Sequence, residues 1–253
     1  MTARSTIIAY HAIGNCPAEE DPHELFVSEE GFATQMELLA RRRNVVTLDA
    51  IVDGRIPDGK PTVAITFDDA YRSVLELAAP VLERYGLPST VFVPTHWIGL
   101  QNAWIPPPSR PLDIMAPEEL VEAERRGIRV ESHGSRHLRY WEIDPTEVEL
   151  DVRSSLERLM DIIGRPPRYL AYPFGPTSAE ASRIVERCGL EAAFTLERPP
   201  GDRFAMERVW IRPRHGLRVF AMKTSGYWSA SWRWSKAGRA GAALLRPVIG
   251  RRH

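Results

Sequence analysis

The chain has 253 residues, 43% of them hydrophobic and 26% charged, which is ordinary for a soluble globular protein and argues against disorder over the whole chain. No stretch is apolar and long enough to span a bilayer, and the start lacks the apolar core and cleavage site of a secretory signal peptide, so we expect a cytoplasmic location. The two cysteines, Cys16 and Cys188, are too few for a disulfide scaffold and are expected to be reduced.

The zero net charge hides an asymmetry along the chain. There are 33 acidic and 33 basic residues, but no Asp or Glu follows Glu207, while 11 Arg and Lys residues lie between Arg208 and His253. One interpretation is that the two parts complement each other on folding. The other is that the basic end meets an anionic partner, such as a lipid headgroup or a lipid-linked phosphate.

Strand-like and helix-like segments alternate through the first half of the chain. Short runs of β-branched and apolar residues predict strands over 6–10, 45–48, 62–67 and 89–93. Apolar residues at helical spacing predict helices over 31–43 and 70–85.

The same alternation continues in the second half. Pro117 predicts the first position of a helix that ends at Gly127, and Asp144 predicts the N-cap of a helix that runs to Gly164. Further elements are expected as strands over 128–132, 169–172 and 192–196 and as a helix over 179–188. This alternation favours parallel strands joined by crossover helices, in a barrel or a doubly wound sheet, with the reactive residues directly after strands.

Two adjacent acids, Asp68 and Asp69, follow the strand expected over 62–67. Neighbouring carboxylates shift each other's pKa, so they need a cation or divided roles, with one binding a metal and the other acting as a base. The structural alternative is a helix N-cap, a position that aspartate favours.

Two histidines, His133 and His137, follow the strand expected over 128–132. At this spacing they could bind one metal ion through neutral imidazoles, or they could be two unrelated loop residues. The pattern is not the zinc helix HExxH, because no Glu stands between them and Gly134 disfavours a helix. Together with one carboxylate, the pair forms a facial triad that leaves positions open for water and substrate.

A third motif, residues 172–175, follows the strand expected over 169–172. Its Pro-Phe-Gly sequence predicts a sharp turn, whose free backbone N–H groups could face a developing oxyanion or could simply form a turn.

These motifs make the chain similar to the polysaccharide deacetylase family, also called the NodB-homology or carbohydrate esterase family four enzymes. The matching segments occur in the family's order and are residues 10–11, 65–70, 91–94, 132–137 and 171–175. The resemblance implies a distorted (β/α) barrel and a bound divalent metal, most often zinc, with cobalt, nickel or iron as alternatives.

The resemblance also implies roles for individual residues. Asp69, His133 and His137 would bind the metal, and Asp68 would be the general base that activates the attacking water. The Phe174 backbone N–H would hold the oxyanion, with Tyr172 also at the substrate. His11, at the end of the first strand as in the branch that deacetylates poly-N-acetylglucosamine, would line the pocket.

Three positions depart from the family pattern. Ala70 stands where a glycine is usual, and Ala171 stands where many members have an arginine that orients the base, so Asp68 needs another partner. The late catalytic histidine has no clean match. His215 is the nearest in order, and His11 and His96 are its rivals for the general acid.

The last residues change in character, which predicts a barrel domain over 1–224 and a basic tail over 225–253. Trp228, Trp232 and Trp234 lie among basic residues, followed by an amphipathic pattern that Pro247 interrupts. Such a segment could lie on the inner face of a membrane or could pack on the barrel, and nucleic-acid binding is not expected.

The combined prediction is a metal-dependent enzyme that removes an acetyl or related acyl group from an N-acetylated amino sugar of a glycan or glycan precursor. The missing signal peptide and the basic tail suggest a lipid-linked or nucleotide-linked sugar. Two alternatives stay open at this point: a non-catalytic glycan-binding protein on the same scaffold, and a non-haem iron oxygenase, which a facial triad also suits.

Overall fold

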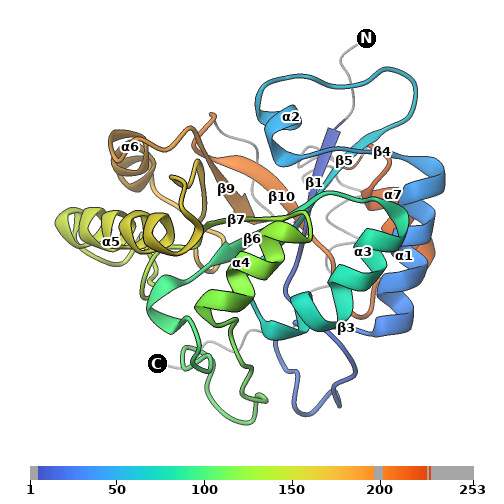
Figure 1. Cartoon of the computed structure of the whole chain (residues 1–253), viewed down its shortest axis with the longest axis horizontal. Coiled ribbons are helices and arrows are strands. Elements are labelled where there is room, and N and C mark those ends of the chain that lie inside the picture. The colour runs from blue at the N-terminus through green and yellow to red at the C-terminus, as the bar shows by residue number, and fades with distance from the viewer. Residues whose placement is uncertain (1–4, 197–201, 227, 229–253) are drawn as a thin grey trace, which may run out of the picture.

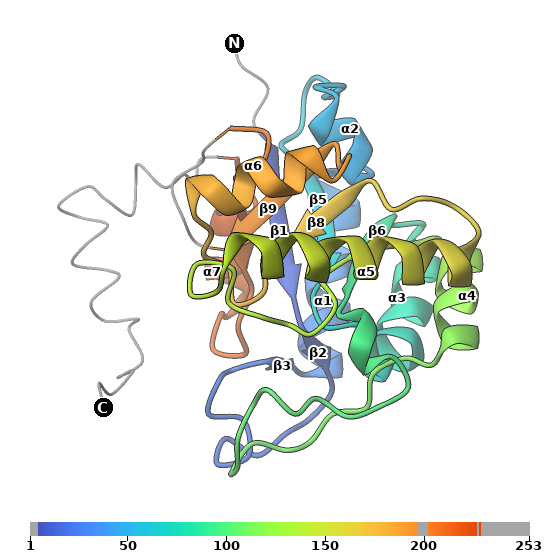
Figure 2. The same cartoon turned by 90° about the vertical axis from the view of Figure 1, so that its left-hand side faces the viewer.

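The computed structural model describes residues 5–196, 202–226 and 228. Seven parallel strands close into a barrel, and Figures 1 and 2 show the helices arranged around it. In the order in which they pair around the ring, the strands are β1 (Ser5–Tyr10), β10 (Met206–Trp210), β9 (Ala192–Leu196), β8 (Tyr169–Ala171), β7 (Ile128–Ser132), β6 (Ser89–Val93) and β5 (Thr62–Phe67). The ring closes because β1 pairs with both β10 and β5, which confirms the expected (β/α) barrel.

Three short strands lie outside the ring. β4 (Asn44–Val45) pairs in parallel with the start of β5, and β2 (Ala12–Ile13) pairs with β3 (Phe26–Val27). The described helices are α1 (Glu29–Arg42), α2 (Leu48–Val52), α3 (Ala79–Tyr85), α4 (Pro117–Arg125), α5 (Pro145–Ile163), α6 (Ala179–Arg187) and α7 (Leu217–Lys223). A π-helical segment, Val74–Ala78, leads into α3, and a 3-10 turn, Thr95–Trp97, follows β6.

Local sequence explains where the helices begin and end. Ser28, Thr47 and Ser178 each accept a hydrogen bond from the backbone of the helix that follows, as N-cap residues do. Asp144 caps α5 in the same way, as the sequence predicts, and α5 ends at Gly164 with a left-handed backbone.

The core has an outer and an inner part. Outside the barrel, the helices bury apolar side chains against the strands, and every residue of β5 is buried, as a strand covered on both faces should be. Inside, Ala64, Phe92, Ala171 and Phe194 belong to one cluster. Arg208 is fully buried beside it, with its guanidinium over the Phe92 ring. The interior is therefore packed, with one charged side chain among apolar ones.

Some elements differ from the sequence-based expectations. The strand expected over 45–48 is shorter, and its last residue begins α2. The helix expected from Ala70 starts later, because Asp69 and Ala70 have left-handed backbones that a helix excludes. Strand β10 and helix α7 were not expected. The domain boundary at 224 follows α7 directly and stays a prediction. The tail over 225–253, with its expected membrane contact, lies almost wholly outside the described residues and also stays a prediction.

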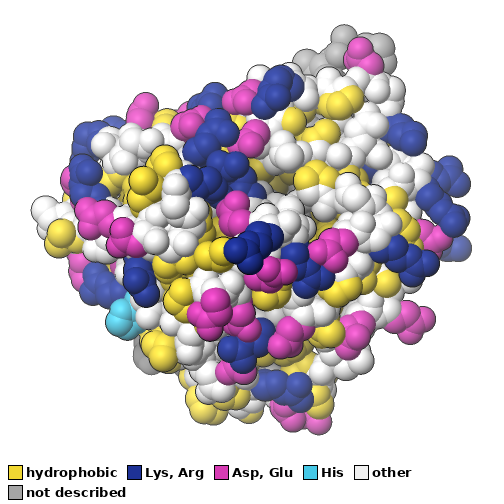
Figure 3. Space-filling model, in the orientation of Figure 1, with side chains coloured by type: hydrophobic (Ala, Val, Ile, Leu, Met, Phe, Trp, Pro, Cys, Tyr) yellow, Lys and Arg dark blue, Asp and Glu magenta, His cyan; other side chains and the backbone are white. Residues whose placement is uncertain are grey.

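Acidic and basic side chains are interspersed over the face in Figure 3, and several of them pair. Arg126 contacts Glu83, and Arg72 contacts Glu119. The view shows no broad patch of one sign on this side of the described residues. None of the helices described is long and apolar enough to cross a bilayer.

Candidate active site

The carboxyl ends of four barrel strands carry the residues that the sequence singles out. His11 follows β1, the pair Asp68 and Asp69 follows β5, His133 follows β7, and Phe174 follows β8. Parallel strands present these ends at one edge, so residues that are far apart in the chain meet there. The site is buried: Asp69 is 3% exposed and His133 is 2% exposed.

Asp69, His133 and His137 converge on one point, with their nearest ligand atoms all within 4.8 Å of one another. Asp69 Oδ1 lies 3.4 Å from His133 Nε2 and 3.1 Å from His137 Nε2. Two ligands about 2.1 Å from one ion, at angles of about 90–110°, are separated by about 3.0–3.4 Å. The spacing therefore fits a shared divalent cation.

The hydrogen-bond geometry supports the same conclusion. Asp69 Oδ1 is buried but accepts no well-aligned hydrogen bond from the described residues, although two imidazole nitrogens are close. Burial would raise the pKa of Asp69, but His137 and His133 hold it well below its ordinary value. An ionised, buried oxygen without a donor is the expected state of a metal ligand whose partner is a cation.

The two histidines are oriented in different ways. His133 Nδ1 lies 2.7 Å from the Ala171 carbonyl oxygen, so Nδ1 carries the proton and Nε2 offers its lone pair. His137 Nδ1 is buried and has no hydrogen-bond partner among the described residues. Its ring instead stacks on Trp104 and meets the edge of Phe174.

Asp68 has a partner that sequence reasoning missed. Arg208, from β10, donates to both carboxylate oxygens at 2.6 and 2.9 Å and also contacts Thr66 Oγ1. Burial raises the pKa of Asp68, but the charges of Arg208, His133 and His11 outweigh it and lower that pKa below its ordinary value. The carboxylate is thus ionised and fixed in one orientation.

Many family members place an arginine at the position of Ala171. In this chain Arg208, on another strand, provides that positive charge instead. Both side chains belong to the barrel interior, on strands β10 and β8. Two signals could have located it: the Asp68 carboxylate lacked a cation, and the apolar residues Val209, Trp210 and Ile211 after Arg208 are strand-prone.

Of the three histidines considered for the general acid, His11 is the one that approaches Asp68. Its Nε2 lies 4.0 Å from Asp68 Oδ2, and its ring packs against Trp210. Burial lowers the pKa of His11, although Asp69 and Asp68 act in the opposite direction. Its Nδ1 has no hydrogen-bond partner among the described residues.

The structure does not bring His215 or His96 into this group. The His215 ring accepts a hydrogen bond from the Arg212 N–H and lies in a hollow beside the start of α1. Within the described chain, no contact joins it to Asp68 or to the metal-ligand set. His96 is exposed, with its ring against Trp97. The geometry therefore does not support the expectation that His215 is the late catalytic histidine.

Tyr172 is expected at the substrate, but its polar groups make their hydrogen bonds within the protein. Its side chain is fully buried, its hydroxyl donates to the Phe204 carbonyl, and its N–H donates to the Phe194 carbonyl. Burial raises its pKa to about 12. Phe174 is the opposite case: its ring is 40% exposed, and no described group accepts its N–H.

Strained backbone gathers at the site. Five described residues other than glycine have positive φ, and four of them are here: Asp69, Ala70, His137 and Phe174. Such conformations cost on the order of 1 kcal/mol or more each and persist where a functional geometry requires them. Ala70, in the usual place of a glycine, adopts the left-handed turn with φ of 51°.

Asp151, on α5, holds the loop that carries both histidines. It accepts hydrogen bonds from the N–H groups of Ser135 and Arg136 and from the Tyr140 hydroxyl. The backbone at Gly134 has φ of 74°, and a Cβ there would lie 2.7 Å from Asp151 Oδ2. Only glycine fits between this network and the strand end.

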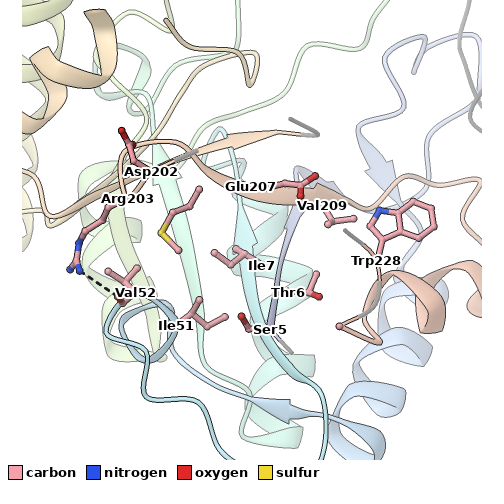
Figure 4. A pocket seen from close by; sticks show the side chains of 12 residues that line it. Ser5, Thr6, Ile7, Ile51, Val52, Asp202, Arg203, Glu207, Val209 and Trp228 are labelled. Atoms are coloured by element: carbon pink, nitrogen blue, oxygen red, sulfur yellow. Dashed lines mark hydrogen bonds between the residues drawn. The ribbon is translucent and has the colours of Figure 1, made fainter. Parts of the chain in front are cut away.

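A cavity of about 530 Å³ lies elsewhere, beside the amino ends of β1 and β10 and against α2 (Figure 4). Ser5, Ile7, Ile51 and Glu207 are among its lining residues. In a parallel barrel this is the edge opposite to Asp68 and His133. The cavity contains none of the metal-ligand set, and we assign it no role in the chemistry.

A buried carboxylate and two imidazoles, beside a second carboxylate at the carboxyl edge of a (β/α) barrel, are typical of enzymes that hydrolyse their substrates with a metal. The family profile described as polysaccharide deacetylase matches residues 55–193, which is more than half of the sequence. The chain belongs to the polysaccharide deacetylase family, whose members are carbohydrate deacetylases.

Individual relatives agree with this assignment. A poly-β-1,6-N-acetyl-D-glucosamine N-deacetylase of Staphylococcus epidermidis is 25% identical over 203 residues, which are 73% of this chain and 68% of that protein. Two solved structures share the fold. The Streptococcus pyogenes deacetylase PplD has a TM-score of 0.75 at 19% identity, covering 87% of this chain and 97% of that one. IcaB of Ammonifex degensii has a TM-score of 0.73 at 24% identity, covering 88% and 97%.

Proposed function

We propose that this protein is a divalent-metal-dependent N-deacetylase that removes an acetyl group from an amino sugar of a glycan or glycan precursor. The observation that carries the proposal is the approach of Asp69 Oδ1 to the two imidazole nitrogens of His133 and His137, beside an ionised Asp68.

Asp69, His133 and His137 would hold the metal, and zinc is the ion that this donor set favours among the candidates, with cobalt, nickel or iron as alternatives. When bound, the ion supplies Lewis-acid chemistry that polarises a carbonyl and makes water easier to deprotonate. His133 is prepared for this role by its bond to the Ala171 carbonyl, which fixes its tautomer.

Asp68 acts as the general base. It accepts a proton from the water that attacks the acetamide carbonyl carbon, and Arg208 keeps the carboxylate in position while it does so. The same bidentate contact lowers the basicity of Asp68, and a metal held by Asp69, His133 and His137 would compensate by making the water more acidic.

His11 donates the proton that the leaving amine needs when the C–N bond breaks, which yields acetate and a free amino sugar. Its Nε2 lies near Asp68, the group that has just received a proton. The Phe174 N–H, which has no acceptor among the described residues, stabilises the oxyanion before that bond breaks.

The test is metal content measured together with acetate release from N-acetylglucosamine oligomers. The purified protein should contain about one divalent ion per chain. Chelation should abolish acetate release, and added zinc or cobalt should restore it. Asp68→Asn should lower kcat by about 10²–10⁴-fold without loss of the metal.

Asp58→Asn is the matched control, since that acid is exposed, precedes the amino end of β5, and has a backbone carbonyl that accepts a hydrogen bond from Asn44. It should leave acetate release unchanged. A protein that binds no divalent ion, or that releases acetate equally well with Asn at position 68, would contradict the proposal.

The substrate is proposed to be an N-acetylated amino sugar because the curated relatives include enzymes named for poly-β-1,6-N-acetyl-D-glucosamine. The lipid-linked form is a further part of the proposal, supported by the basic composition of the residues after Arg208. Those residues lie mostly outside the described ranges. Hydrolysis of soluble oligomers, with no activity on polyprenyl-phosphate sugars and no binding to liposomes, would exclude it.

The two rival functions lose support. Two features favour a non-catalytic glycan-binding protein: the absence of arginine at position 171 and the absence of a clear late histidine. Arg208 removes the first reason, and His11 is the group proposed to take the place of that histidine. An iron oxygenase gives Asp68 no role, whereas Asp68 here is buried, oriented and ionised.

A further inference from the structure

The two histidines of the ligand set differ in what holds their rings. His133 is oriented by a hydrogen bond from Nδ1 to a backbone carbonyl. Metal-binding histidines usually have such a partner, because it fixes the tautomer and the ring plane. His137 Nδ1 is buried without a hydrogen-bond partner among the described residues, so no polar contact of that kind fixes its ring.

Aromatic packing takes the place of the hydrogen bond. The indole of Trp104 lies parallel to the His137 imidazole, with ring centroids 4.2 Å apart and an interplanar angle of 21°. Phe174 meets the same imidazole in a T-shaped contact at 4.6 Å, and the Trp97 ring packs against Trp104 in a second T-shaped contact at 5.5 Å. The imidazole plane cannot tilt away from the indole without losing the stack.

Trp104 belongs to a hairpin-like excursion, residues 99–115, between β6 and α4. Its stem pairs Gly99 with Met115 and Asn102 with Leu112 through backbone hydrogen bonds. The stem is tied to the segment just after the Asp pair, since Met115 donates to the Ala70 carbonyl. Asn102 donates to the hydroxyl of Tyr71. The indole therefore keeps a fixed place relative to the strand end that carries Asp69.

This arrangement joins two loops that are distant in sequence. One end of the hairpin is bonded to the turn that carries Asp69, and its tryptophan covers the imidazole of His137. A cation bound by Asp69 and His137 would also strengthen the stack. The imidazole gains positive charge when it coordinates a cation, and the face of an indole attracts positive charge.

We propose that Trp104 is a positioning residue for the metal site, which fixes the His137 imidazole by stacking where the usual hydrogen bond is absent. The inference rests on the proposed metal-dependent function. It predicts a metal affinity that depends on the planar ring at position 104 even when no sugar is present.

The experiment compares Trp104→Phe and Trp104→Leu with the full-length wild type, all stripped of metal and titrated with zinc and, separately, with cobalt. Trp104→Leu should lose about 10–100-fold in metal affinity, as removal of supporting contacts typically does. Trp104→Phe keeps a planar ring and should stay within about threefold of wild type. The visible absorption of the cobalt form should change in the leucine variant and persist in the phenylalanine variant.

Trp141→Ala is the matched control, because Trp141 packs near Phe174 but makes no contact with His137 in the described structure. Its metal affinity and cobalt spectrum should match wild type. If Trp104→Leu binds both metals like wild type and only the KM for sugar rises, Trp104 is a wall of the substrate pocket and the inference is overturned. If wild type itself binds no divalent ion, the proposed function fails first, so the two failures can be told apart.

Discussion

Two buried histidines in this barrel have opposite electrostatic surroundings. Burial lowers the pKa of His11, and the two carboxylates of the site that it faces act in the opposite direction. His215 faces no such group: burial, together with Lys223, Arg212 and Arg214, lowers its pKa to about 3. His215 is thus neutral at physiological pH, and its ring serves as an acceptor for the Arg212 N–H.

A neutral buried histidine makes stability depend on pH. Above its unfolded-state pKa of 6.5, His215 is neutral in both states and has no effect. As the pH falls below that value, the unfolded chain takes up a proton that the folded chain refuses, so stability is lost down toward the folded pKa. Between about pH 7.5 and about pH 4.5 this contributes on the order of 3 kcal/mol.

His215→Asn should remove that contribution, since asparagine can accept the same N–H but does not titrate. Urea unfolding of the metal-free protein at both pH values measures it. His23→Asn, at an exposed position, is the control and should leave the pH dependence unchanged. Equal pH dependence in wild type and His215→Asn would show that His215 takes up its proton in the folded state.

At the scale of elements, the turn after β7 is the most constrained piece of the site. Gly134 has a left-handed backbone, and a Cβ there would overlap the Tyr140 hydroxyl and lie 2.7 Å from Asp151 Oδ2. Gly127, just before the same strand, has φ of 80° but open space around it. An alanine at position 127 would meet backbone strain alone, whereas an alanine at position 134 would meet both backbone strain and steric overlap.

Gly127→Ala should lower the free energy of unfolding by about 1–2 kcal/mol, the cost of a left-handed alanine. Gly134→Ala should cost roughly 3 kcal/mol or more, because the overlap displaces Asp151 and the loop that it holds. It should also weaken metal binding, which Gly127→Ala should not. Denaturant unfolding and a zinc titration of both variants measure these effects, and similar losses in the two variants would refute the argument from Asp151.

Elements with a continuous apolar run could be predicted from the sequence. The strands expected over 62–67, 89–93, 128–132 and 192–196 have the predicted bounds. Strand β10 was missed because Glu207 and Arg208 interrupt its apolar pattern, and the acid that compensates Arg208 lies 140 residues away. Local patterning carries no information about such a pair, whereas motifs at strand ends, such as Asp68-Asp69, carry their own signal.

The residues of the candidate site also divide into those that the sequence could predict and those that it could not. The cluster of Asp69, His133 and His137 could be expected, because each residue directly follows or lies near the end of a predicted strand. Trp104 could not, since it reaches His137 from a loop that has no recognisable pattern. The motif does not reveal which of its residues are buried, since Tyr172 lies in the core while Phe174, two residues later, is exposed.

At the scale of the whole molecule, the barrel interior has room for one arginine. Arg208 fills it from β10, between Asp68 and the Phe92 ring, while the small side chain of Ala171 leaves the space free from β8. A charged side chain buried with its partner is tolerated, but either group alone is costly.

Moving the arginine from β10 to β8 tests this view. Arg208→Ala should destabilise the fold by about 3–5 kcal/mol, because Asp68 is left without a partner. Ala171→Arg should cost more than about 4 kcal/mol, through overpacking and like charge. The double variant should be more stable than either single variant and should regain part of the acetate release. Unfolding curves measure stability, and an acetate assay measures activity. If the stability losses of the two single variants simply add in the double variant, side chains at positions 171 and 208 do not occupy the same part of the barrel interior.

Ring closure by β10 also has a consequence for biosynthesis. In chain order, β1 is the first strand of the ring and β10 is its last, so the ring cannot close, and Asp68 cannot meet its guanidinium partner, until β10 has been synthesised. A nascent chain that has not yet reached Met206 exposes an open sheet edge and an uncompensated interior acid. The ion pair that orients Asp68 can therefore form only after the chain has been synthesised past Arg208.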